Sequence, residues 1–112
     1  MKNHAETIER VNTNVALCHE TLVKLKDTCC MSTRSAKMVL LAEKVQNLGM
    51  KTEDVTDAYI DTHFVHVEDV GAALGTLYAT CCTKTREKLY QDMFRALGII
   101  NLGLHKLNGV SH

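Results

Sequence analysis

The sequence predicts an all-α domain, an antiparallel four-helix bundle built from two similar helical hairpins in tandem over residues 1–112. Three observations lead to this prediction: apolar residues recur at helical spacing, aromatic residues are few, and one short motif occurs twice. With two Phe, three Tyr and no Trp, the core has to come mainly from aliphatic side chains, which suits packed helices better than a β-sandwich. The chain also has no proline to break a helix, and its length is that of one domain.

The first predicted helix spans about residues 4–30. Its apolar residues are separated alternately by three and four positions, which places them on one face of a helix, as in a heptad repeat. These residues are Ile8, Val11, Val15, Cys18, Leu22, Leu25 and Cys29. Charged side chains fall off this stripe, so one face is expected to be buried and the other exposed.

The second predicted helix follows Met31-Ser32-Thr33, because the two hydroxyl groups can cap the free amides at a helix N-terminus. Its apolar stripe consists of Met38, Leu41, Val45 and Leu48. Gly49 comes directly after this stripe, and glycine favours the left-handed conformation that ends many helices. We therefore expect the helix to end at Gly49.

The third predicted helix covers about residues 53–82 and the fourth about residues 85–108. A continuous third helix creates a conflict of length, since the first helix would be about 40 Å long and the second only about 25 Å. Residues 62–67 are β-branched, aromatic or histidine, and this composition also suits a strand or a bend. We predict a break near residues 62–66 in preference to an overhang covered by a partner chain.

The motif Thr-Cys-Cys-x-x-Thr-Arg occurs at residues 28–34 and again at residues 80–86. The same shift of 52 residues superimposes the apolar stripes of the two halves. The matching positions in the second half are Ile60, His63, Val67, Val70, Leu74, Leu77 and Cys81, followed by Tyr90, Met93, Leu97 and Ile100. His63 is the one polar member. This internal similarity predicts two pseudo-repeats, about 4–51 and 56–108.

The duplicated cysteine pairs are the first candidates for a metal site. An up-down-up-down bundle brings both motifs to the same end, and four thiolates can bind zinc or an iron–sulfur cluster. The candidate ligands are Cys29, Cys30, Cys81 and Cys82. Adjacent residues of a helix, however, point about 100° apart, and structural zinc sites use cysteines two to four residues apart. The alternative is that each motif is a helix junction whose first Cys ends the apolar stripe.

His63 and His66 are the second candidates, because residues three apart share a helix face. The Glu-x-x-His pairs of di-iron bundles are missing, and a single His in an apolar stripe is more often a core residue with hydrogen-bond partners. We therefore predict neither a metal nor a cofactor.

The sequence gives no support to an enzyme. It has no glycine-rich phosphate loop, no Gly-x-Ser-x-Gly and no His-Glu-x-x-His. The net charge is zero and no long basic stripe is present, which argues against a nucleic-acid partner. Residues 52–83 hold six acidic side chains and no Lys or Arg, so we expect them to pack beside the basic flanks or to face a basic partner.

The protein is expected to be cytoplasmic. No apolar run approaches the ~20 residues of a membrane span, and residues 1–6 lack the apolar core of a signal peptide. In a reducing cytoplasm the five cysteines would remain thiols.

Apolar residues outside the main stripes are the strongest functional signal. They predict helix faces that are either central in the bundle or buried against another chain. The candidate interface residues are Leu17, Val23, Val39, Leu40, Ile99, Leu102 and Leu104. The favoured function is a non-enzymatic interaction module or assembly subunit that binds a protein partner or itself. Two alternatives stay open: a metal- or redox-responsive bundle that uses the four junction cysteines, and a small-ligand site in the bundle core near His63 and Tyr78.

Overall fold

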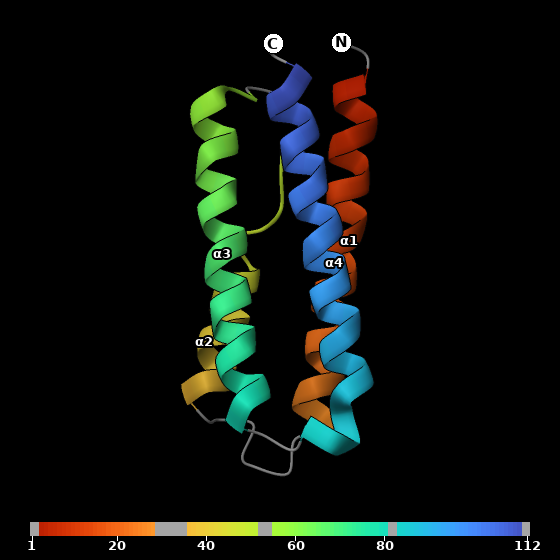
Figure 1. Cartoon of the computed structure of the whole chain (residues 1–112), viewed down its shortest axis with the longest axis vertical. Helices are drawn as coiled ribbons and strands as arrows, with labels where there is room; N and C mark the ends of the chain where they lie inside the picture. Colours follow the sequence, from red (N-terminus) through yellow and green to blue (C-terminus); the bar gives the residue numbers. More distant parts are fainter. Residues whose placement is uncertain (1–2, 29–35, 52–54, 81–82, 111–112) are drawn as a thin grey trace.

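Four helices make up the computed structural model, which describes residues 3–28, 36–51, 55–80 and 83–110. They are α1 (Asn3–Thr28), α2 (Ala36–Val45), α3 (Asp57–Thr80) and α4 (Thr83–Val110), and the described residues contain no strand. Successive helices run in opposite directions, so α1 begins at the end of the bundle where α4 finishes (Figure 1). The prediction of an all-α antiparallel four-helix bundle is confirmed.

The helices stand at the corners of a square. Each packs against two neighbours, in the order α1, α2, α3, α4 and back to α1, whereas the diagonal pairs are not in contact within the described ranges. The bundle measures 46 × 21 × 18 Å. Its length agrees with the rise of about 1.5 Å per residue over the 26 residues of α1 and the 28 residues of α4.

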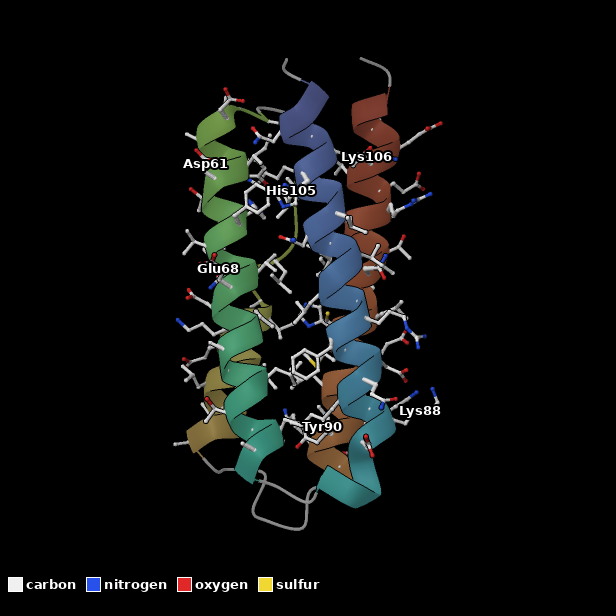
Figure 2. All side chains as sticks on the ribbon, viewed as in Figure 1. Asp61, Glu68, Lys88, Tyr90, His105 and Lys106 are labelled. Atoms are coloured by element: carbon white, nitrogen blue, oxygen red, sulfur yellow. The ribbon has the colours of Figure 1, made fainter. Side chains whose placement is uncertain are left out.

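The predicted apolar stripes form the core. Every stripe position in the described part of the chain is buried, apart from the partly buried Val67. Tyr90 is a fully buried aromatic residue of the core (Figure 2). Its ring lies edge-on to that of Tyr78, with centroids 5.1 Å apart. The three-and-four spacing therefore predicted the buried face of each helix correctly, including the position of His63.

The predicted break near residues 62–66 is wrong, because α3 is one continuous helix. The conflict of length is resolved before α3 begins. The helix α2 has only 10 residues and ends at Val45 instead of Gly49. A turn follows, in which the amides of Asn47 and Leu48 donate to the carbonyls of Lys44 and Val45, and the non-helical chain then runs along the bundle toward the start of α3 (Figure 1).

Side chains of α1 and α3 hold residues 49–51 against the bundle. The Asn12 amide nitrogen donates to the Met50 carbonyl oxygen at 2.9 Å, and the Met50 amide donates to the Asn12 side-chain oxygen at 2.9 Å. The Lys51 amide donates to the Tyr59 hydroxyl at 2.7 Å. Because Met50 is buried, its two bonds to Asn12 satisfy backbone groups that are largely removed from water. We call Asn12 and its two bonds to Met50 the Asn12 clamp.

The two hairpins share their buried positions but differ in the length of their second helices, which have 10 residues in α2 and 28 in α4. The tandem duplication, with pseudo-repeats at 4–51 and 56–108, remains a prediction of the sequence. The predicted caps at Ser32 and Thr33 lie outside the described residues.

Among the described residues, one ion pair joins the acidic segment to the basic flanks. Lys44 of α2 and Asp69 of α3 form an ion pair at 3.8 Å. Asp57, Asp61 and Glu68 are exposed, and within the described ranges no ion pair joins them to a base. Most of the acidic surface is therefore directed to solvent.

Candidate functional site

The four junction cysteines, Cys29, Cys30, Cys81 and Cys82, lie outside the residues that the structure describes. The metal- or redox-responsive alternative thus remains a prediction of the sequence. Over the described ranges, no three His, Cys, Asp or Glu residues are grouped closely enough to hold a metal ion.

His63 is a structural residue of the core. Its Nδ1 lies 3.0 Å from the Tyr59 carbonyl oxygen, and its Nε2 lies 3.0 Å from the Gly49 carbonyl oxygen. A metal ligand needs a ring nitrogen whose lone pair faces open space, and both nitrogens of His63 face carbonyl groups instead. The His66 ring is edge-on to His63, with centroids 5.5 Å apart. These contacts favour a structural role for His63, and the candidate metal pair His63 and His66 remains a prediction of the sequence.

The structure does not bring together His63 and Tyr78, so the small-ligand alternative near these two residues remains a prediction of the sequence. The two residues are 15 positions apart on the continuous helix α3, which separates them by about 22 Å along its axis. Tyr78 lies instead in an aromatic cluster with Tyr90 and Phe94, at centroid distances of 5.1 Å and 6.2 Å.

Cys18 is a buried free thiol on the core face of α1. Burial raises the pKa of this thiol from 9.0 to about 12, because the thiolate would lose its hydration in the apolar core. A thiol with such a pKa is a poor nucleophile at neutral pH. Cys18 therefore acts as a small apolar side chain, and no catalysis is assigned to it.

The buried thiol predicts a loss of stability in alkali. The folded state favours the protonated thiol, so its contribution is complete below pH 9 and disappears as the pH rises toward 12. At pH 10 the free energy of unfolding should be lower by about 1.4 kcal/mol than at pH 8 from this group alone. Urea denaturation gives the free energy of unfolding of wild type and of Cys18→Ala at pH 8 and at pH 10. The loss between the two pH values should be larger in wild type, and the excess is the contribution of the Cys18 thiol. Equal dependences in the two proteins would contradict the assignment.

Exposed aliphatic side chains occur on both α1 and α4, which pack against each other. Leu102 of α4 is 67 % exposed and Leu17 of α1 is 45 % exposed. Leu17 lies seven residues, or two helical turns, after Arg10 and so shares its face of α1. Ile99, one turn before Leu102, is partly buried. Three of the seven predicted interface residues thus belong to one face.

The other four predicted interface residues lie elsewhere. Val39 and Leu40 are exposed on α2, diagonally across the bundle from α4. Val23 is exposed on α1, but six residues from Leu17 corresponds to about 120° around the helix. Leu104 is fully buried in the core, so it must be removed from the predicted interface. An apolar residue beside a stripe widens the buried face of a central helix as readily as it marks a contact surface.

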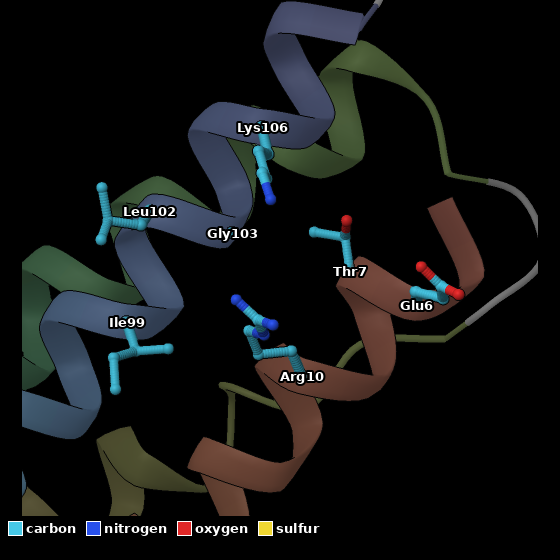
Figure 3. Close-up of a pocket in the computed structure, with 7 residues that line it drawn as sticks. All are labelled: Glu6, Thr7, Arg10, Ile99, Leu102, Gly103 and Lys106. Carbon is cyan, nitrogen blue, oxygen red and sulfur yellow. The ribbon is translucent and has the colours of Figure 1, made fainter. Parts of the chain in front are cut away.

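A groove of about 660 Å³ opens between the first turns of α1 and the last turns of α4 (Figure 3). It is lined by Glu6, Thr7, Arg10, Ile99, Leu102, Gly103 and Lys106. Arg10 and Lys106 extend into the groove from opposite helices, and Leu102 lies at its edge (Figure 3). Within the described ranges no ion pair joins either cation to a carboxylate. The groove thus combines an aliphatic wall with two cations that lack an acidic partner.

Gly103 lets α1 and α4 come close together beneath the groove. A Cβ atom at this position would lie 2.5 Å from Cγ2 of Val11, which is inside van der Waals contact. Gly98 lies on the same helix, and a Cβ atom there would meet no atom within 4 Å. Only Gly103 of these two glycines is required by packing.

Sequence analysis missed the cations of the groove. Arg10 and Lys106 are 96 positions apart, and each reads as an ordinary charged residue on the solvent face of its own helix. A signal was present in α4, where Arg95 and Lys106 flank Ile99 and Leu102 at helical spacing. Nothing in the sequence, however, indicates that α1 and not α2 supplies the second wall.

The described helices include none with both the length and the apolar character that a membrane span requires. Comparison of the chain with known protein families, with curated proteins and with solved structures finds no match.

Proposed function

We propose that the protein is a non-enzymatic helical interaction module, which binds a helix of a protein partner or of a second copy in the groove between α1 and α4. The observation that carries this proposal is Leu102, which is 67 % exposed at a groove that Arg10 and Lys106 also line. The exposed Leu17 lies beyond the groove, on the same face of α1 as Arg10. Exposed aliphatic residues that line up along a groove mark a contact surface, whereas scattered ones carry no such meaning.

The geometry favours a helix as the occupant. Two packed helices leave a shallow groove along their contact, and an amphipathic helix can lay its apolar face into such a groove. Full burial of an exposed leucine side chain contributes about 1.5–3 kcal/mol. Leu17 and Leu102 are already partly covered, so each contributes a part of this value when a partner buries the rest. The cations of the groove favour a partner with acidic residues beside its apolar ones.

The proposed location is the cytoplasm, and no nucleic-acid partner is proposed. A reducing compartment keeps unpaired cysteines as thiols, and the free Cys18 supports this assignment. The zero net charge supports the absence of a nucleic-acid partner, because phosphate binding depends on an excess of Lys and Arg.

The test is a pull-down with the purified 112-residue chain. The double variant Leu17→Glu, Leu102→Glu places one carboxylate at the groove and another on the same face of α1, two turns beyond Arg10. We expect recovery of specifically bound protein to fall by about tenfold or more. The matched control is Val39→Glu, Leu40→Glu, since Leu40 at 44 % and Leu17 at 45 % are equally exposed. The control should retain full binding. Equal recovery by wild type and both double variants would contradict the proposal.

A further inference from the structure

The charged surface of the bundle is divided between two sides. On the outer face of α3, Asp61 and Glu68 are exposed, and Val65 between them is 53 % exposed. Spacings of four and three residues place all three on one side of the helix. Asp61 and Glu68 project from the flank of the bundle that lies away from α4 and α1, while Lys88 and Lys106 lie on the α1–α4 side (Figure 2).

The outer face of α4 carries the complementary pattern. Arg95 and Lys106 are exposed, and the aliphatic Ile99 and Leu102 lie between them at helical spacing. The order on α3 is acid, aliphatic, acid, and the order on α4 is base, aliphatic, base. Arg10 adds another cation from α1 at the same groove. One lining carboxylate, that of Glu6, opposes this charge, which leaves the groove with an excess of cations.

We propose that the protein associates head to tail with itself, with the outer face of α3 of one copy seated in the α1–α4 groove of the next. Asp61 and Glu68 then meet the cations of the groove, and Val65 packs against Leu102. The inference rests on the proposed function, because it requires the groove to be a docking site, and it specifies a second copy as the occupant. The two faces lie on different sides of the bundle, so each copy can hold two neighbours and the contact forms open chains or rings.

A second copy suits the groove for two physical reasons. The chain has zero net charge, so copies do not repel one another at long range. In addition, Asp61 and Glu68 have no basic partner among the described residues of their own chain, so docking costs no internal ion pair. Exposed charge pairs add little affinity but orient the encounter, and the buried aliphatic residues supply the rest. We therefore expect a dissociation constant of roughly micromolar order.

Sedimentation velocity over a range of concentrations tests the proposal. Wild type should show a weight-average mass that rises with concentration and falls again when the NaCl concentration is raised from 0.05 to 0.5 M, because salt screens exposed charges. The acidic-face variant, Asp61→Lys with Glu68→Lys, and the groove variant, Arg10→Glu with Lys106→Glu, should each weaken self-association by about tenfold or more. All four residues are exposed or line the open groove, and circular dichroism with thermal unfolding verifies that both variants are folded.

Mixing the two variants is the decisive measurement. The reversed α3 face of one variant then complements the reversed groove of the other, and their unchanged faces complement each other as well, so association should return in the mixture.

A wild type that remains monomeric at all concentrations would overturn the inference, as would an acidic-face variant that associates as strongly as wild type. A monomeric wild type whose protein capture is still lost in Leu17→Glu, Leu102→Glu overturns only self-association and leaves the groove as a docking site. If Leu17→Glu, Leu102→Glu retains both protein capture and self-association, the groove as a docking site and the head-to-tail contact are both refuted.

Discussion

Replacement of Asn12 with alanine is expected to lower the free energy of unfolding by about 2–4 kcal/mol. The Asn12 side chain both donates to and accepts from the Met50 backbone, at 2.9 Å in each case. Alanine removes both bonds and leaves the part-buried amide and carbonyl of Met50 without these partners. A polar group that is removed from water and unsatisfied costs more free energy than a hydrogen bond contributes. With a total stability of about 5–15 kcal/mol, this is one of the largest effects expected of a single polar residue.

Urea denaturation followed by circular dichroism measures the loss, and Thr13→Ala is the matched control. Thr13 is the next residue on α1, but its exposed hydroxyl donates only to the Glu9 carbonyl of its own helix. Its replacement should change stability by less than about 0.5 kcal/mol. Hydrogen exchange provides a local readout, because the Met50 amide should lose protection in Asn12→Ala. If both variants were equally stable, the Asn12 clamp would have no role in holding residues 49–51.

The second large effect is a difference of about 1.5–3 kcal/mol between two glycine-to-alanine variants of α4. Gly103→Ala should destabilise the bundle by about 1–2 kcal/mol, because overpacking outweighs the helix propensity of alanine. The added Cβ would meet Cγ2 of Val11, a β-branched and fully buried side chain that has little freedom to rotate. Gly98→Ala should stabilise it by about 0.5–1 kcal/mol, because its Cβ enters open space within a helix.

Thermal unfolding of the two variants compares the same substitution on the same helix. The sign of the stability change therefore depends only on the surroundings of each glycine. The reason for the loss at Gly103 can be tested with Val11→Ala, which removes the clashing methyl group. In that background Gly103→Ala should cost clearly less than in wild type, since residues in contact are energetically coupled. A stabilising effect of Gly103→Ala in wild type would show that α1 and α4 can separate at no cost.

The buried face of each helix was predictable from the sequence because burial follows the helical period. In α1, Ile8 and Leu25 are more than four turns apart, yet both lie on the stripe and both are buried. The same period correctly placed His63 in the core. It could not distinguish Leu104, which is buried, from Leu102, which is exposed, since both lie among the apolar residues of α4.

The end of α2 and the continuity of α3 were not predictable in this way. Local propensity at residues 62–67 favoured a bend, but packing against α2 and α4 keeps α3 helical throughout. The early end of α2 depends on the contacts that replace helical hydrogen bonds in residues 49–51. Asn12, 38 positions away from Met50, supplies two of them, and no local pattern reveals such a partner.

The sequence by itself determined the all-α class, the number of helices and the residues that face the core, because helical periodicity and the lack of proline are properties of each segment alone. Only the tertiary structure decided that Arg10 and Lys106 share a groove with Leu102, that His63 faces two carbonyl groups, and that the acidic face of α3 lies away from the groove. These arrangements bring together residues far apart in the chain. They depend on the order in which the helices pack and on the close approach of α4 to α1 at Gly103. The apolar pattern of a single helix predicts neither of these.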